Sequence, residues 1–189
     1  LSSSKSLDIF FSAVLLLSSA LLLCSEPLSA KILLPLLGGS PSVWTTSLVF
    51  FQILLFAGYA YAHMTTRHLT PTVQMRLHLV LLAIPLLWTP FAIPQVLPDA
   101  WHQVPALAVL WLLATSIGIP FFLLSANSSL LQRLFHSYTG REPYGLFAAS
   151  NAGSLLGLLA FPFLLEPAMG LSRIAEHWRQ AYGLLWIGL

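Results

Sequence analysis

The chain has 189 residues, of which 8 are Lys or Arg and 6 are Asp or Glu, so that only 7% are charged. A soluble globular domain carries about 25% charged residues, whereas 57% of this chain is hydrophobic and its mean hydropathy is +0.83. These values exclude a water-soluble domain, and the high apolar content also excludes a disordered chain. We therefore expect an all-α, polytopic integral membrane protein.

Six segments are predicted to be membrane-spanning helices, because a span needs about 20 mostly apolar residues. Pro27 lies inside the first segment, and three prolines are expected to bend the third. The loops between the segments are short, so residues 1–189 are predicted to form a single transmembrane domain. The chain starts and stops without clear ends, which predicts a fragment of a longer protein. The approximate spans are 9–37, 43–63, 77–96, 105–126, 144–165 and 178–189.

The distribution of cations predicts the orientation, since cytoplasmic loops carry an excess of Lys and Arg. A cytoplasmic N-terminus is predicted, because it places more cations inside than outside. The inside cations would be Lys5, Arg67, Arg76, Arg133 and Arg141, and the outside ones Lys31, Arg173 and Arg179. Tryptophans near predicted span ends are interpreted as interfacial anchors; they are Trp44, Trp101 and Trp178.

Several function classes are excluded by what the sequence lacks. The cations are scattered singly, whereas nucleic-acid binding needs clustered Lys and Arg, so no nucleic-acid partner is expected. Cys24 is the single cysteine, which excludes an internal disulfide and a multi-cysteine metal site. No dinucleotide, phosphate-loop or H-E-x-x-H motif is present. We therefore predict no catalytic residue, no metal and no cofactor in this chain.

Glu26 is the strongest candidate for a functional residue, because a charge at the centre of a membrane helix costs about 2.5–3.5 kcal/mol. It lies five residues before Lys31, a spacing that places the two about 140° apart on an ideal helix. One interpretation is a carboxylate that binds a cation or a proton or that locks two helices. The other is a residue near the outer interface with Lys31 snorkelling to water. Glu166 is interpreted as an interfacial stop.

With Glu26, Lys31 and four further polar residues are candidates for a solute cavity; the four are Gln52, Tyr59, Asn127 and Asn151. Amide side chains in spans also form interhelical hydrogen bonds, which contribute about 0.6–2 kcal/mol, so a structural role is their default interpretation. No spacing in the sequence distinguishes the two roles.

The fifth predicted span carries small residues at four-residue intervals, namely Ala149, Gly153 and Gly157. Small residues on one face let two helix backbones approach closely. These positions are predicted to be a helix-packing face, whose partner is either another span of the chain or a second subunit.

Several stretches are too specific to be generic membrane sequence. They are Glu26-Pro27 followed by Lys31, PLLGGSPSVW from Pro35 to Trp44, FFQ and AGYAYAH between Phe50 and His63, and PFFLLSANSSLLQRLF and PYGLFAASNAGSLLGLLAFPFLLEP between Pro120 and Gly170. Together they cover nearly the whole chain. The chain resembles the membrane region of bacterial spermidine synthase-like proteins described as fused major-facilitator/spermidine synthase proteins.

This resemblance implies a half-facilitator-like bundle in the bacterial inner (cytoplasmic) membrane, often followed by a cytoplasmic domain similar to a polyamine synthase. Such a catalytic domain would lie beyond Leu189, so no residue here is assigned to aminopropyl transfer. The segment from His63 to Arg76 carries cations but no acid and no glycine. In this it departs from the facilitator signature, which argues against active transport.

Three functions remain open at this point. The leading hypothesis is the membrane domain of a spermidine synthase-like protein that transports or senses a polyamine-like small solute, with Glu26 handling the cation. The second is a membrane anchor for a catalytic domain, and the third is a structural partner that packs against another membrane protein. The expected partners are the lipid bilayer, a small cationic solute, and either a second copy of the chain or a downstream domain.

Overall fold

The structure is a computed structural model that describes residues 2–88, 91–92 and 104–189. The described chain is helical and contains no strand. Its elements are α1 (Ser2–Leu37), α2 (Pro41–His68), α3 (Pro71–Ala83), the 3₁₀ turn η1 (Ile84–Leu87), α5 (Pro105–Leu113), the π-helical turn η2 (Ala114–Gly118), α6 (Ile119–Thr139), α7 (Tyr144–Ala160), the π-helical turn η3 (Phe161–Leu165), α8 (Glu166–Ala168) and α9 (Leu171–Gly188).

Local sequence signals explain where the helices begin and end. Pro41, Pro71 and Pro105 occupy the first turn of α2, α3 and α5, where the missing N–H leaves no helical bond unmade. The Ser40 side chain caps α2 by accepting a hydrogen bond from the Val43 N–H at 3.4 Å. Gly140 ends α6 with a φ of 65°, a left-handed conformation that glycine adopts without strain.

Four helical stretches are long and apolar enough to cross a membrane: Lys5–Leu37, Pro41–His68, Pro105–Thr139 and Tyr144–Ala168. They contain the first, second, fourth and fifth predicted spans. Beyond the fourth predicted span, 105–126, the helix continues to Thr139, and Asn127 is buried within it.

The other two predicted spans differ more from the structure. The third was placed at 77–96, but α3 begins at Pro71 and the shorter apolar helix ends at Leu87; residues 89–90 and 93–96 lie outside the described residues. The sixth was placed at 178–189, whereas α9 begins at Leu171. Its first turns carry Arg173, Glu176 and Arg179, so α9 is less apolar than the four long stretches.

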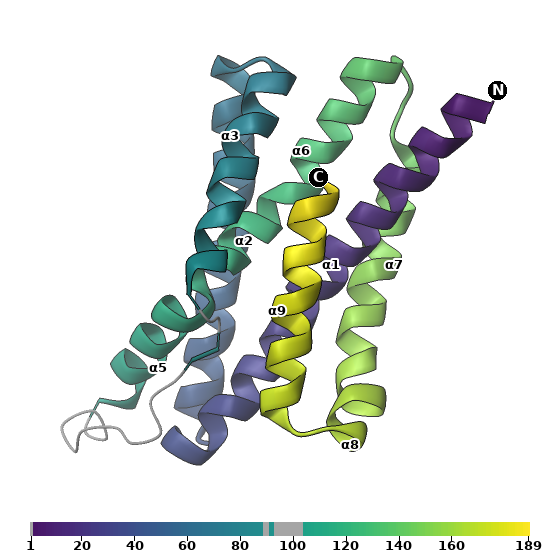
Figure 1. Cartoon of the computed structure of the whole chain (residues 1–189). Coiled ribbons are helices and arrows are strands. Elements are labelled where there is room, and N and C mark those ends of the chain that lie inside the picture. The colour runs from purple at the N-terminus through teal and green to yellow at the C-terminus, as the bar shows by residue number, and fades with distance from the viewer. Residues whose placement is uncertain (1, 89–90, 93–103) are drawn as a thin grey trace.

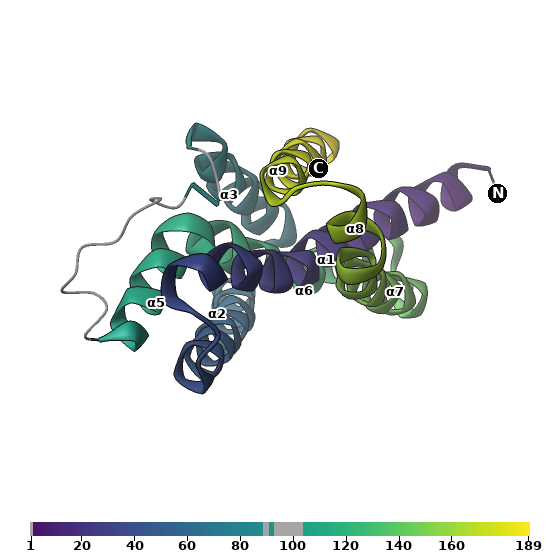
Figure 2. The same ribbon diagram turned by 90° about the horizontal axis from the view of Figure 1, so that it is seen from below.

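Helix α1 crosses the bundle diagonally and forms its centre (Figure 1). It packs against α7, α6 and α9, while α2 packs against α6, α5 and the neighbouring α3. Seen from below, α1 runs across the bundle with α9 on one side of it and α7 on the other, while α2 and α5 lie toward the C-terminal end of α1 (Figure 2). The turn between α1 and α2 lies at the same end of the bundle as α8 (Figure 1). The turn between α2 and α3 and the turn between α6 and α7 lie at the opposite end.

The predicted glycine face of α7 lies against α1 of the same chain. A Cβ at Gly153 would overlap the backbone carbonyl of Leu16, and one at Gly157 would overlap that of Ala20. Ala149 lies on the same row and is half-buried. The close approach of the two backbones thus requires glycine at these two positions, and this face is occupied within the chain.

A charged contact joins the beginning of α1 to the turn that precedes α7. Arg141 donates two hydrogen bonds to the Asp8 carboxylate, at 3.0 and 2.8 Å. These hydrogen bonds and the negative charge of Asp8 raise the pKa of the Arg141 guanidinium. Because both side chains are exposed, the pair contributes little to stability and chiefly marks a polar end of the bundle.

The outer faces of α2 and α7 are covered with exposed apolar side chains. Phe56 on α2 is 75% exposed, and Phe163 after α7 is 72% exposed. A surface of this kind is unfavourable in water but suits contact with lipid acyl chains. The exposed apolar belt and the four long apolar helices agree with a membrane protein.

Candidate functional site

A pocket of about 200 Å³ lies beside Glu26, where α1, α2 and α7 meet. Its wall is mainly apolar and aromatic, and Glu26 is its single ionisable side chain. The lining residues are Glu26, Pro27, Ala30, Trp44, Ser47, Leu48, Phe51 and Leu158. We call this the Glu26 pocket.

The spacing of residues along α1 and α2 explains why these side chains meet. Glu26 and Ala30 are four residues apart on α1, and Trp44, Ser47, Leu48 and Phe51 follow the i, i+3, i+4, i+7 pattern of one helix face. The tight turn between the two helices contains Gly38, whose φ is 73°. This turn folds the beginning of α2 back onto the end of α1, so that one wall of the pocket faces the other.

Lys31 forms an ion pair with Glu166 and not with Glu26. Its Nζ lies 2.6 Å from Glu166 Oε1, and both side chains are partly exposed. Glu166 thus holds α8 against α1, which adds a structural role to its interpretation as an interfacial stop. Glu26 has no ion pair and no hydrogen-bonding side chain among the residues that the structure describes. Its carboxylate is therefore open to a cationic guest.

The remaining candidate residues do not join Glu26. Gln52 is exposed on the outer face of α2, where it lines a shallow groove with apolar neighbours. Tyr59 is 53% exposed on the same helix, and Asn151 is exposed on α7. Asn127 is fully buried in α6, where its Nδ2 donates to Ser18 Oγ at 2.9 Å.

Sequence reasoning missed the aromatic and hydroxyl residues that complete the pocket. Trp44 was interpreted as an interfacial anchor, and Ser47 and Phe51 were not singled out. The signal that could have found them is the helical spacing of these three residues behind the Gly38–Pro41 turn. That turn folds the beginning of α2 back toward the end of α1.

A second polar feature, also missed, surrounds Gln74 on α3. Gln74 is 1% exposed, and its Nε2 donates to Thr65 Oγ1 at 2.6 Å and to Thr66 Oγ1 at 3.1 Å. Arg133 on α6 donates to Gln74 Oε1 and also to the Leu69 carbonyl, the latter at 3.1 Å. These bonds tie α3 and α6 to the turn between α2 and α3.

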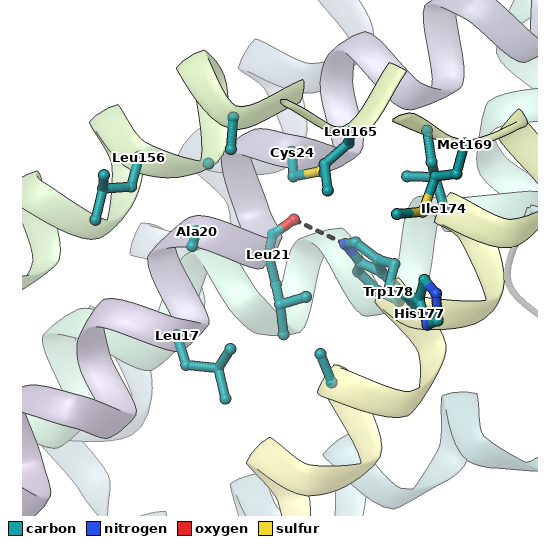
Figure 3. Close-up of a pocket in the computed structure, with 13 residues that line it drawn as sticks. Leu17, Ala20, Leu21, Cys24, Leu156, Leu165, Met169, Ile174, His177 and Trp178 are labelled. Atoms are coloured by element: carbon teal, nitrogen blue, oxygen red, sulfur yellow. Dashed lines mark hydrogen bonds between the residues drawn. The ribbon is translucent and has the colours of Figure 1, made fainter. Parts of the chain in front are cut away.

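An apolar cavity of about 240 Å³ lies between α1, α7 and α9 (Figure 3). Trp178 closes one side of it, and its Nε1–H donates to the Leu21 carbonyl at 2.9 Å. The interpretation of Trp178 as an interfacial anchor is therefore wrong, because its side chain is 3% exposed. Trp101, the third predicted anchor, lies outside the described residues. Cys24 faces the same cavity, which has no carboxylate or Lys and Arg side chain to orient a polar ligand.

Comparison of the chain with protein-family models, with curated proteins and with solved structures found no match.

Proposed function

We propose that the chain is the multi-pass membrane domain of a spermidine synthase-like protein and that it binds a small, polyamine-like cation at the Glu26 pocket for transport or sensing. The observation that carries this proposal is the Glu26 carboxylate, which forms no ion pair with any described residue, while Lys31 is paired with Glu166. The sequence resemblance to the membrane region of spermidine synthase-like proteins supports the same class of solute.

The chemistry of the pocket fits an alkylamine. An ammonium group would neutralise the Glu26 carboxylate, which a membrane helix holds at considerable cost when it is charged. A cation over the face of a tryptophan gains about 0.5–2 kcal/mol, and Trp44 lines the pocket beside Glu26. The methylene groups of a polyamine would contact the apolar wall that Leu48 and Phe51 provide.

The proposal includes six spans in a half-facilitator-like bundle. In it, α3 with η1 forms the third span and α9 the sixth. A helix rises 1.5 Å per residue, so the 18 residues of α9 extend about 27 Å, close to the hydrocarbon thickness of about 30 Å. The proposed location is the bacterial inner membrane with a cytoplasmic N-terminus. Its support is that the beginning of α1, the end of α2 and the turn between α6 and α7 lie at one end of the bundle (Figure 1), and these segments carry Lys5, Arg67 and Arg141.

The test is a binding isotherm of spermidine with the purified chain in lipid nanodiscs. Glu26→Gln removes the unpaired carboxylate with almost no change in volume, and we expect it to weaken binding at least about tenfold, the loss of roughly 1.4 kcal/mol. Glu176→Gln is the matched control, because it removes a carboxylate that is paired with Arg179 on α9 and leaves the Lys31–Glu166 pair intact. Equal weakening by the two variants, or unchanged binding by Glu26→Gln, would overturn the proposal.

A further inference from the structure

Side chains from four helices meet in the interior of the bundle, away from the Glu26 pocket. His78 on α3 and Asn127 on α6 are both fully buried. The ring of Tyr61 on α2 lies 5.8 Å from that of His78, measured between centroids. The Asn127 amide lies next to the His78 ring and donates to Ser18 on α1. We call His78, Tyr61 and Asn127 the internal polar site.

The internal polar site has four buried polar atoms without a protein partner. These are both ring nitrogens of His78, the Tyr61 hydroxyl and the Asn127 Oδ1. The Asn127 amide approaches the His78 ring, but none of the four atoms makes a hydrogen bond of good geometry with a described residue. Buried polar groups in native proteins are almost always hydrogen-bonded, to protein or to ordered water. Four such atoms on adjacent side chains therefore indicate a shared guest.

The neighbouring cluster around Gln74 provides the contrast. Gln74 lies one helical turn before His78 on α3, and its amide nitrogen and oxygen both have protein partners. The fold thus satisfies buried amides where its own groups suffice. Elsewhere in the described chain, Ser29, Trp88 and Ser116 each have one buried side-chain atom without a partner, whereas the internal polar site has four.

The chemistry of the four atoms selects water as the guest. A neutral imidazole offers one donor and one acceptor, a hydroxyl offers both, and an amide oxygen accepts. Water can donate and accept, and it is small enough for a site that is closed to the outside. A cation is disfavoured, because Arg133 lies beyond Gln74 on the side of the turn between α2 and α3.

We propose that the internal polar site binds water within the bundle and that this water bridges His78, Tyr61 and Asn127. The polar row from His78 through Gln74 to Arg133 and the Leu69 carbonyl leads from this site toward the end of the bundle. This inference is independent of a cation at the Glu26 pocket.

Water-to-protein magnetisation transfer in the full chain tests the proposal. The chain is labelled with ¹⁵N in histidine and tryptophan, and the His78 signal is identified by its loss in His78→Phe. We expect transfer from water to the His78 ring. Two internal references are available: exposed His136 reports bulk water, and the buried Trp178 indole, which donates to Leu21, reports a dry site. A His78 signal as dry as that of Trp178 would overturn the proposal.

The variant Tyr61→Phe gives a second, independent readout. If water bonds the hydroxyl, its removal raises the unfolding equilibrium constant roughly threefold, the effect of an average hydrogen bond inside a membrane protein. If the site is dry, the variant removes an unpartnered polar group and makes the protein more stable. Greater stability of Tyr61→Phe would therefore contradict the proposal even if His78→Phe fails to fold.

Discussion

Lys31 Nζ lies 2.6 Å from Glu166 Oε1, so the cation five residues after Glu26 is paired with a different carboxylate. The pair joins α1 to α8 across the end of the bundle. The pairing of Lys31 with Glu166 matters for the Glu26 pocket, because a Lys31 that was paired with Glu26 would neutralise the carboxylate of the pocket.

We expect the Lys31–Glu166 pair to contribute little to stability. Both side chains are partly exposed, at 41% and 34%, and exposed ion pairs contribute about 0–1 kcal/mol. A double-mutant cycle with Lys31→Met and Glu166→Gln, read as the free energy of unfolding in mixed micelles, measures the coupling. A coupling well above 1 kcal/mol would show that the pair is a major structural contact.

Gly153→Ala and Gly157→Ala are expected to destabilise the fold by about 1–3 kcal/mol each, the usual penalty of overpacking. The added methyl group meets the backbone of α1 at both positions. Gly145→Ala is the matched control on α7, since a Cβ there meets nothing within 4 Å. The measurement is the free energy of unfolding of the three variants in mixed micelles. Equal free energies for all three would contradict the packing of α7 on α1.

Gln74→Leu is expected to destabilise the chain by about 1–3 kcal/mol, because it removes the buried amide that accepts from Arg133 and donates to the hydroxyls of Thr65 and Thr66. Gln52→Leu is the control: the same substitution on the exposed face of α2 removes an amide that has no protein partner to lose. We expect it to be neutral or stabilising in thermal unfolding. A larger loss for Gln52→Leu would instead indicate that a second chain covers that face.

Trp178→Phe tests the contact between α9 and α1. The substitution keeps the aromatic packing beside Tyr182 but removes the hydrogen bond to the Leu21 carbonyl, a loss of about 1 kcal/mol. Trp186→Phe removes a similar hydrogen bond to the Leu79 carbonyl. Because that bond is exposed, we expect a smaller loss of stability. If both variants unfold like the wild type, the indole bond does not hold α9 in place.

The sequence predicts the helices better than it predicts which residues meet. Apolar runs and prolines locate α1, α2, α7 and the long helix from Pro105, because each signal is local. Gln52 and Asn127 show the limit: both are amides within apolar helices, yet one faces outward and the other is buried. Hydropathy does not distinguish these faces.

The contacts that build the two polar features join residues far apart in the chain. Arg133 and Gln74 are 59 positions apart, and His78 meets residues of α2 and α6. Such pairs depend on how the helices cross, which no spacing within one helix specifies. The Glu26 pocket is intermediate between local and long-range contacts, since the short turn after α1 brings the aromatic residues of α2 close to Glu26.

The central claim is that an amine binds at the Glu26 carboxylate. Carbodiimide cross-linking of the bound amine to the carboxylate tests this claim most directly. An apolar carbodiimide joins a bound amine to the carboxylate in contact with it, forming an amide that peptide mass spectrometry locates. With spermidine as the amine, we predict the adduct on Glu26, its loss in Glu26→Gln, and little adduct on Glu166. An adduct on Glu166 or Glu176 with Glu26 unmodified would contradict the account.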